Sequence, residues 1–210
     1  MTLRPLAALA FTAGTVVLIT GLTVLGMAPG SPEDGRHLRK QKSRTGVPSE
    51  VTAVTIADIQ QLPHGRPLAE VAAIEARGVL MEGYVQRMLL AGDGDLHLEL
   101  APTQRAPGGA DTLYVTAEIS PSWRHGSTSW QHEALRERFR PNHGGPAPWE
   151  SGPKRVRLTG WLLYDGPYDR QPSRWSLENA APRVSGWEIH PVTRIEVWDE
   201  ALAAWTEVVR

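Results

Sequence analysis

The sequence predicts a mainly β protein whose domain is a five-stranded OB-fold-like Greek-key barrel. Five runs within residues 77–198 alternate apolar and polar residues with a period of two, which is typical of half-buried strands. One helical pattern separates the third run from the fourth, where an OB-fold has its helix. A β-sandwich would need more strands and a parallel α/β fold would need more helices, so we predict the barrel.

An apolar segment precedes this domain. Residues 5–27 contain no charged side chain and are long enough to cross a bilayer as one helix. The stretch around Ala28 is a poor signal-peptidase site, so we expect an anchor that stays attached, with a cleaved signal peptide as the alternative. Five basic residues follow between 36 and 44, and the positive-inside rule then places the barrel in the cytoplasm. A retained export signal would place the barrel outside the membrane.

The segments that flank the barrel have their own compositions. Residues 28–50 hold three prolines and the basic run, which is typical of a solvated linker. Thr55 and Asp58 fit a capping box, so short helical turns are expected after residue 51. The predicted order is an anchor at 1–27, a linker at 28–50, a helical lead-in at 51–76, the barrel at 77–198 and a C-terminal tail at 199–210.

The barrel strands follow in order. The first run, 79–86, contains Gly83, which suits the bend that a small barrel needs. The second run, 95–100, is the most regular, with leucine at every even position. The third run is 113–119, and a helix is predicted between Thr128 and Pro141. The fourth run is 155–165.

The fifth run, 186–198, carries His190 directly before Pro191. Proline cannot donate to a strand ladder, so it marks an edge, a first residue or a bulge. The alternation continues beyond it, so we predict an irregularity around which His190 makes hydrogen bonds. The residues predicted to face the core are Trp187, Ile189, Ile195 and Val197.

A binding surface is predicted on the outward face of the second, third and fifth runs. These runs are neighbours in an OB-fold, and many OB-folds hold their ligands on this side. The long loop before the fifth run adds arginines and aromatic rings, which can stack on a partner. The predicted binding residues are Asp95, His97, Tyr114, Glu118, Tyr168, Arg170, Arg174, Trp175, Glu188 and His190.

Two functions fit this surface. The leading one is a membrane-anchored binding module with a protein partner, for example an accessory subunit of a membrane complex. The alternative is a metal-dependent hydrolase of the phosphodiesterase or nuclease type, with zinc or another divalent ion. Its candidate catalytic residues are His97, His190, Asp95 and Glu118. Glu118 would stand between the two histidines, so we expect no tight metal site and no cofactor. A solvated face with cross-strand ion pairs would show the same residue types.

Composition excludes several other classes. The net charge of −1 and the pI near 6.7 lack the basic excess of a nucleic-acid binder, so nucleic acid is not an expected partner. The absence of cysteine excludes thiol catalysis and cysteine-ligated zinc. Neither a phosphate-binding glycine motif nor a Gly-x-Ser-x-Gly elbow occurs.

Several segments of the barrel resemble an uncharacterised family of bacterial OB-fold-like proteins. The family has an Asp-x-Asp-x-His element, here residues 93–97, and a late Glu-Ile/Leu-His-Pro-Val element, here 188–192. The resemblance covers roughly residues 77–198 and implies the fold but no activity. Relatives often have a histidine shortly after the aspartate that ends the fourth strand, and here Tyr168 takes that place. This departure weakens a metal site that needs a third histidine.

Overall fold

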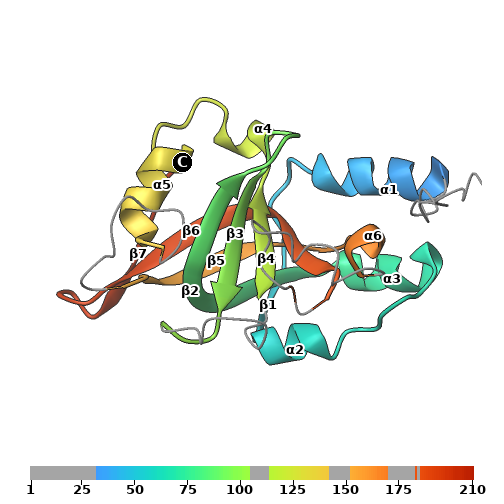
Figure 1. Cartoon of the computed structure of the whole chain (residues 1–210), viewed down its shortest axis with the longest axis horizontal. Coiled ribbons are helices and arrows are strands. Elements are labelled where there is room, and N and C mark those ends of the chain that lie inside the picture. The colour runs from blue at the N-terminus through green and yellow to red at the C-terminus, as the bar shows by residue number, and fades with distance from the viewer. Residues whose placement is uncertain (1–31, 105–113, 142–151, 170–182, 184) are drawn as a thin grey trace, which may run out of the picture.

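A computed structural model describes residues 32–104, 114–141, 152–169, 183 and 185–210 (Figure 1). The described residues form one seven-stranded sheet with helices around it. The strands are β1 (Val51–Val54), β2 (Gly78–Leu90), β3 (Leu96–Ala101), β4 (Val115–Ile119), β5 (Arg155–Tyr164), β6 (Trp187–Asp199) and β7 (Ala204–Glu207). The helices are α1 (Pro32–Lys42), α2 (Ile56–Gln60), α3 (Leu68–Glu75), α4 (Pro121–Arg124), α5 (His132–Phe139) and α6 (Gly166–Asp169).

Five of the strands close into a barrel. Their order is β2-β3-β4-β6-β5, and an antiparallel pairing between β2 and β5 closes the ring. β4 and β6 run parallel and meet at Ala117 and Ile189. Two helices, α4 and α5, lie between β4 and β5 in the chain. The mainly β, five-stranded closed barrel is therefore confirmed, with two short helices in place of the one expected.

The flanking segments contain more regular structure than their composition indicated. α1 lies inside the range expected to be a linker, and its last turn carries Arg39, Lys40 and Lys42, where cations interact favourably with the helix dipole. The capping box of Thr55 and Asp58 is present at the start of α2. β1 adds to β2 as a parallel strand, and β7 forms a hairpin with β6. Both of these strands have four residues, too few for a clear alternation.

β6 contains the irregularity expected at Pro191. Leu162 pairs with Ile189 and Leu158 pairs with Ile195, so six steps along β6 match four along β5. Two extra residues restore the alternation, and Trp187, Ile189, Ile195 and Val197 all lie in the core as predicted. The peptide bond before Pro191 is cis. A Cβ on Gly160 would lie 2.5 Å from the carbonyl oxygen of Pro191, so only glycine fits opposite this irregularity.

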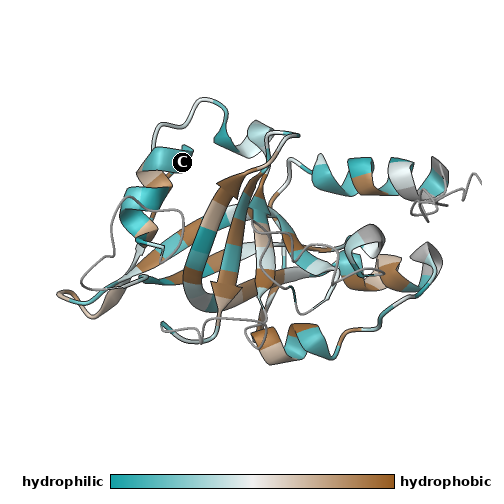
Figure 2. Ribbon diagram, in the orientation of Figure 1, coloured by the Kyte–Doolittle hydropathy of each residue, from teal (hydrophilic) through white to brown (hydrophobic). Residues whose placement is uncertain are grey.

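The predicted membrane span, residues 5–27, lies outside the described residues. Among the helices that are described, none has the length and apolar character needed to cross a bilayer. The core fills the inside of the barrel, and apolar residues recur along the central strands in Figure 2. All residues of β3 and β4 are buried, the outward ones included. Something therefore covers the outer face of these two strands.

Candidate functional site

The outward face of β3, β4 and β6 is polar, and the structure buries it. Glu188 and His190 are 0% exposed, as the core leucines are. The alternation pattern alone had led us to expect a face open to solvent. Two segments cover this face. One is the end of α1 with Lys42, and the other contains Arg183, shortly before β6. We call the following residues the polar cluster: Lys42, Asp95, His97, Glu99, Glu118, Asp165, Arg183, Glu188 and His190.

Glu118 on β4 is at the centre of the polar cluster. Its Oε1 lies 3.2 Å from Nε2 of His97 and 3.4 Å from Nη2 of Arg183. Its Oε2 lies 3.0 Å from Nδ1 of His190 and 3.6 Å from Nζ of Lys42. Burial alone would raise the pKa of Glu118, but His190 and Lys42 hold it well below its ordinary value. Glu118 is therefore a buried carboxylate that depends on its cationic neighbours.

The hydrogen bonds around His190 show that both of its ring nitrogens donate. Ser120 Oγ donates its single hydrogen to the carbonyl oxygen of Lys42 and so accepts from Nε2 of His190, 3.0 Å away. Nδ1 donates to Oε1 of Glu188 at 3.1 Å. His190 is therefore an imidazolium. Burial would lower its pKa, but Glu118 and Glu188 outweigh burial and raise the pKa of His190 to about 9.

His97 makes a different set of contacts. The guanidinium of Arg183 lies 3.5 Å from Nδ1 of His97, and since a guanidinium only donates, Nδ1 accepts. Nε2 then carries the hydrogen and faces Oε1 of Glu118. The two histidines thus contact opposite oxygens of Glu118, which stands between them as the strand order predicted. Among the described residues, the two rings do not converge on one point from a shared side.

Arg183 and Lys42 supply the other positive charges. Arg183 pairs with Oε2 of Glu188 at 2.9 Å, and its guanidinium lies 4.0 Å from the centre of the Tyr168 ring. Lys42 makes looser contacts, 3.8 Å to Oδ2 of Asp95 and 4.0 Å to Oδ2 of Asp93. Burial lowers the pKa of both cations, but the carboxylates, Glu188 first, outweigh it and raise both. Both cations hold buried anions in place.

Negative charge nevertheless exceeds positive charge in the polar cluster. Asp95, Glu99, Glu118, Asp165 and Glu188 are five carboxylates, whereas Lys42, Arg183 and His190 are three cations. Among the described residues, the buried Oδ1 of Asp165 accepts no hydrogen bond, and Glu118 Oε2 has ion-pair contacts with His190 at 3.0 Å and Lys42 at 3.6 Å. Buried acceptors without partners are rare and usually indicate a water or an ion. The polar cluster has room, electrostatically, for more positive charge.

The raised pKa values of the other acids also indicate that the polar cluster has too little positive charge. Burial, then the charge of Glu118, raises the pKa of Glu188 to about 7 despite Arg183 and His190. Burial also raises the pKa of Asp95 and of Asp165 above the ordinary aspartate value. A carboxyl group whose pKa rises in this way has lost more from dehydration than its cationic neighbours restore.

Three side chains of the polar cluster are arranged like metal ligands. One ligand atom each of Asp95, Glu118 and His190 lies within 4.8 Å of the others, and all three residues are buried. Three of the four candidate residues of the hydrolase hypothesis are in this group, and the fourth, His97, is not a member. A histidine nitrogen with two carboxylates suits zinc and neighbouring divalent metals.

The structure brings together seven of the ten predicted binding residues. Asp95, His97, Glu118, Glu188 and His190 belong to the polar cluster, and Tyr114 and Tyr168 contact Arg183. The remaining three lie outside the described residues: Arg170, Arg174 and Trp175. The predicted binding residues lacked four members of the polar cluster: Lys42, Glu99, Asp165 and Arg183. The alternation of β3 could have indicated Glu99, and the strand-ending position could have indicated Asp165. Lys42 and Arg183 come from segments without periodicity.

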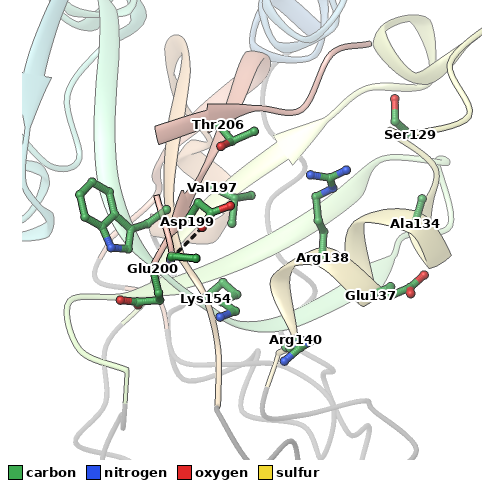
Figure 3. A pocket seen from close by; sticks show the side chains of 12 residues that line it. Ser129, Ala134, Glu137, Arg138, Arg140, Lys154, Val197, Asp199, Glu200 and Thr206 are labelled. Carbon is green, nitrogen blue, oxygen red and sulfur yellow. Dashed lines mark hydrogen bonds between the residues drawn. The ribbon is translucent and has the colours of Figure 1, made fainter. Parts of the chain in front are cut away.

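A second concave region lies away from the polar cluster. This groove, of about 660 Å³, runs between α5 and the β6–β7 hairpin (Figure 3). Three basic residues, Arg138, Arg140 and Lys154, line it together with three acidic ones, Glu137, Asp199 and Glu200. The balanced charges select no sign of ligand, and none of the predicted site residues is there.

Comparisons with known proteins leave the family of this chain open. No family model and no curated protein matches it. Among solved structures, it is similar to an asparaginyl-tRNA synthetase from Entamoeba histolytica, with 15% identity and a TM-score of 0.36 over 70% of this chain and 24% of the enzyme. An aspartyl-tRNA synthetase from the same organism gives 17% identity and a TM-score of 0.32 over 70% and 22%. The chain thus spans about a quarter of these enzymes, and the fold assignment rests on the strand order above.

Proposed function

We propose that the protein is an OB-fold-like binding module that holds a divalent metal ion in its polar cluster. Asp95, Glu118 and His190 are the proposed ligands. The observation that carries this proposal is the convergence of their three ligand atoms within 4.8 Å at a buried position. The site lies on the outward β3–β4 face, which is the ligand side in many OB-folds.

The charge balance supports an ion of charge +2. Five carboxylates face three cations, and this excess of negative charge favours the binding of a divalent cation. The ion would take over the contact that His190 now makes with Glu118 Oε2 at 3.0 Å. For His190 to bind the ion, one ring nitrogen must lose its proton, so binding should release a proton. The same carboxylates repel phosphate, which disfavours a nucleic acid on this face.

Burial favours holding an ion over hydrolysis. A hydrolytic metal site keeps one position open to water and substrate. Here Asp95 is 5% exposed, Glu118 is 1% exposed and His190 is 0% exposed. The hydrolase alternative retains one supporting observation, the placement of His97 beside Glu118, with 3.2 Å between Nε2 and Oε1. A substrate could reach that histidine only if the cover moved.

Metal titration by calorimetry tests this proposal. We expect chelator-treated protein to bind one zinc ion per chain and to lose at least about 10-fold in affinity in Asp95→Asn and in Glu118→Gln. Glu196→Gln is the matched control, because Glu196 is a buried carboxylate of β6 outside the polar cluster and outside the ligand group. Wild-type protein that binds no divalent ion, or equal losses in all three variants, would overturn the metal site.

The membrane anchor and the protein partner remain proposals. Residues 5–27 are an uncharged apolar segment of spanning length, which supports an anchor. Carbonate extraction combined with intact mass tests it, and a soluble product that begins near Ala28 would contradict it. A partner in a membrane complex would have to meet the domain outside the covered face, and co-purification of the full chain from membranes would identify it.

A further inference from the structure

The feature that extends the proposed function is the position of Lys42 at the end of α1. Its Nζ lies 3.6 Å from Glu118, 3.8 Å from Asp95 and 4.0 Å from Asp93. All three distances exceed those of a hydrogen bond, so the ammonium group balances charge without a fixed bond. Two of these carboxylates are also proposed metal ligands. Lys42 therefore pairs with the same carboxylates that would bind the ion.

An ion and this ammonium group would repel each other. A divalent ion bound to Asp95 and Glu118 would lie within a few ångströms of Nζ, in a buried place where charges are weakly screened. Lys42 is also the cation that can leave most easily. Its side chain is 26% exposed, whereas that of Arg183 is 9% exposed and makes a 2.9 Å bond to Glu188.

α1 itself is attached mainly by polar contacts. None of its described residues belongs to the hydrophobic core cluster. Besides the ion pairs of Lys42, the contacts that hold α1 are a 2.5 Å contact between His37 and Glu75, the hydrogen bond from Ser120 to the Lys42 carbonyl, and a 2.7 Å hydrogen bond from Arg44 to Gln41. Figure 1 shows α1 outside the barrel, at one end of the molecule. An element with few buried apolar contacts opens at low free-energy cost.

We propose that Lys42 is a tethered cation that occupies the metal site in competition with the ion, and that ion binding releases α1 from the barrel. This inference rests on the proposed metal site and adds its regulation. When the ion is absent, the lysine supplies part of the positive charge that faces Asp95 and Glu118. When the ion binds, the lysine and the end of α1 move away. Ion binding therefore changes the position of the segment that precedes the barrel.

Two measurements on the full chain test this competition. Zinc affinity by calorimetry is compared between wild type, Lys42→Met and Lys40→Met, because Lys40 is an exposed residue of the same helix. We expect Lys42→Met to raise the affinity at least about 10-fold and Lys40→Met to leave it unchanged. Amide hydrogen exchange in wild-type protein should become faster across 32–42 when zinc is added. The exchange measurement needs no variant, so it decides the question even if Lys42→Met does not fold.

The outcomes separate the two proposals. Zinc binding by neither wild type nor Lys42→Met would overturn the metal site itself. Zinc binding with the same affinity in both proteins, or exchange across α1 that stays unchanged or slows, would overturn the competition and leave the metal site standing. Binding by Lys42→Met alone would support exclusion of the ion by Lys42 and overturn metal binding by the intact chain.

Discussion

The two faces of β3 and β4 are equally buried, but different forces hold them. The inner face carries Leu96, Leu98 and Leu100, each 0% exposed, and packing against the other apolar strands stabilises it. The outer face carries His97 and Glu118, which are 8% and 1% exposed and depend on charged partners. Apolar burial tolerates many partners, whereas a buried charge needs particular ones at particular distances.

The difference teaches where specificity lies in this domain. Any set of apolar side chains with the right total volume would pack the inner face. The outer face works only with Lys42 and Arg183 above it, and these cations still leave negative charge in excess. Stability alone does not explain such an arrangement, since well-packed apolar residues often do as well or better than buried ion pairs. The proposed metal ion would account for it.

The largest expected effect is on the outer face. Glu118→Ala removes the carboxylate shared by four neighbours and should lower the free energy of unfolding by about 3–5 kcal/mol, since buried cations then lose their partner. Denaturant titration measures it. Glu133→Ala, whose side chain is 79% exposed, is the control and should cost less than about 1 kcal/mol. A loss below about 1 kcal/mol for Glu118→Ala would mean that the outer face contributes little.

The matching change in the core is Ile195→Ala. Ile195 is 0% exposed, so the cavity should cost about 2–5 kcal/mol of unfolding free energy. Its neighbour Arg194, with a side chain that is 50% exposed, provides the control Arg194→Ala, with an expected loss under about 1 kcal/mol. Equal small losses in both variants, measured by the same titration, would show that this part of β6 has the opposite parity.

A pH series distinguishes the two faces without a core substitution, because only the outer face carries groups that titrate. The pKa of His190 is raised to about 9, so its stabilising contribution is complete below about pH 6.5 and is lost as pH rises through 9. Glu188, whose pKa is raised to about 7, acts in the same direction between about pH 4.5 and 7. We expect metal-free protein to lose about 3 kcal/mol between pH 6.5 and 9.

Urea midpoints at several pH values measure this loss. His190→Gln should remove most of the dependence above pH 6.5, whereas His125→Gln, at an exposed position, should retain it. A midpoint that stays constant or rises over this window in the wild-type protein would show that His190 is not held as an imidazolium.

Local sequence patterns were sufficient for the barrel and for the membership of its inner face. The leucines at 96, 98 and 100 alternate cleanly, and the alternation of β6 survived its irregularity because two extra residues cancel in parity. The polar residues that β3, β4 and β6 contribute to the site were also predictable, since they occupy the other positions of the same strands. The flanking strands β1 and β7 were not, because four residues give too little periodicity.

Only the tertiary structure decided what those polar residues do. A period of two says that a side chain points away from the core, but it does not say what lies above it. Here Lys42 lies more than 50 residues before β3, and Arg183 lies more than 60 residues after β4. These distant segments bury the polar face, and their charges set the protonation of His190. The fold also brings Asp95, and not His97, into one group with Glu118 and His190. Electrostatic interactions depend on distance in space and on dehydration, and neither is written in the local order of residues.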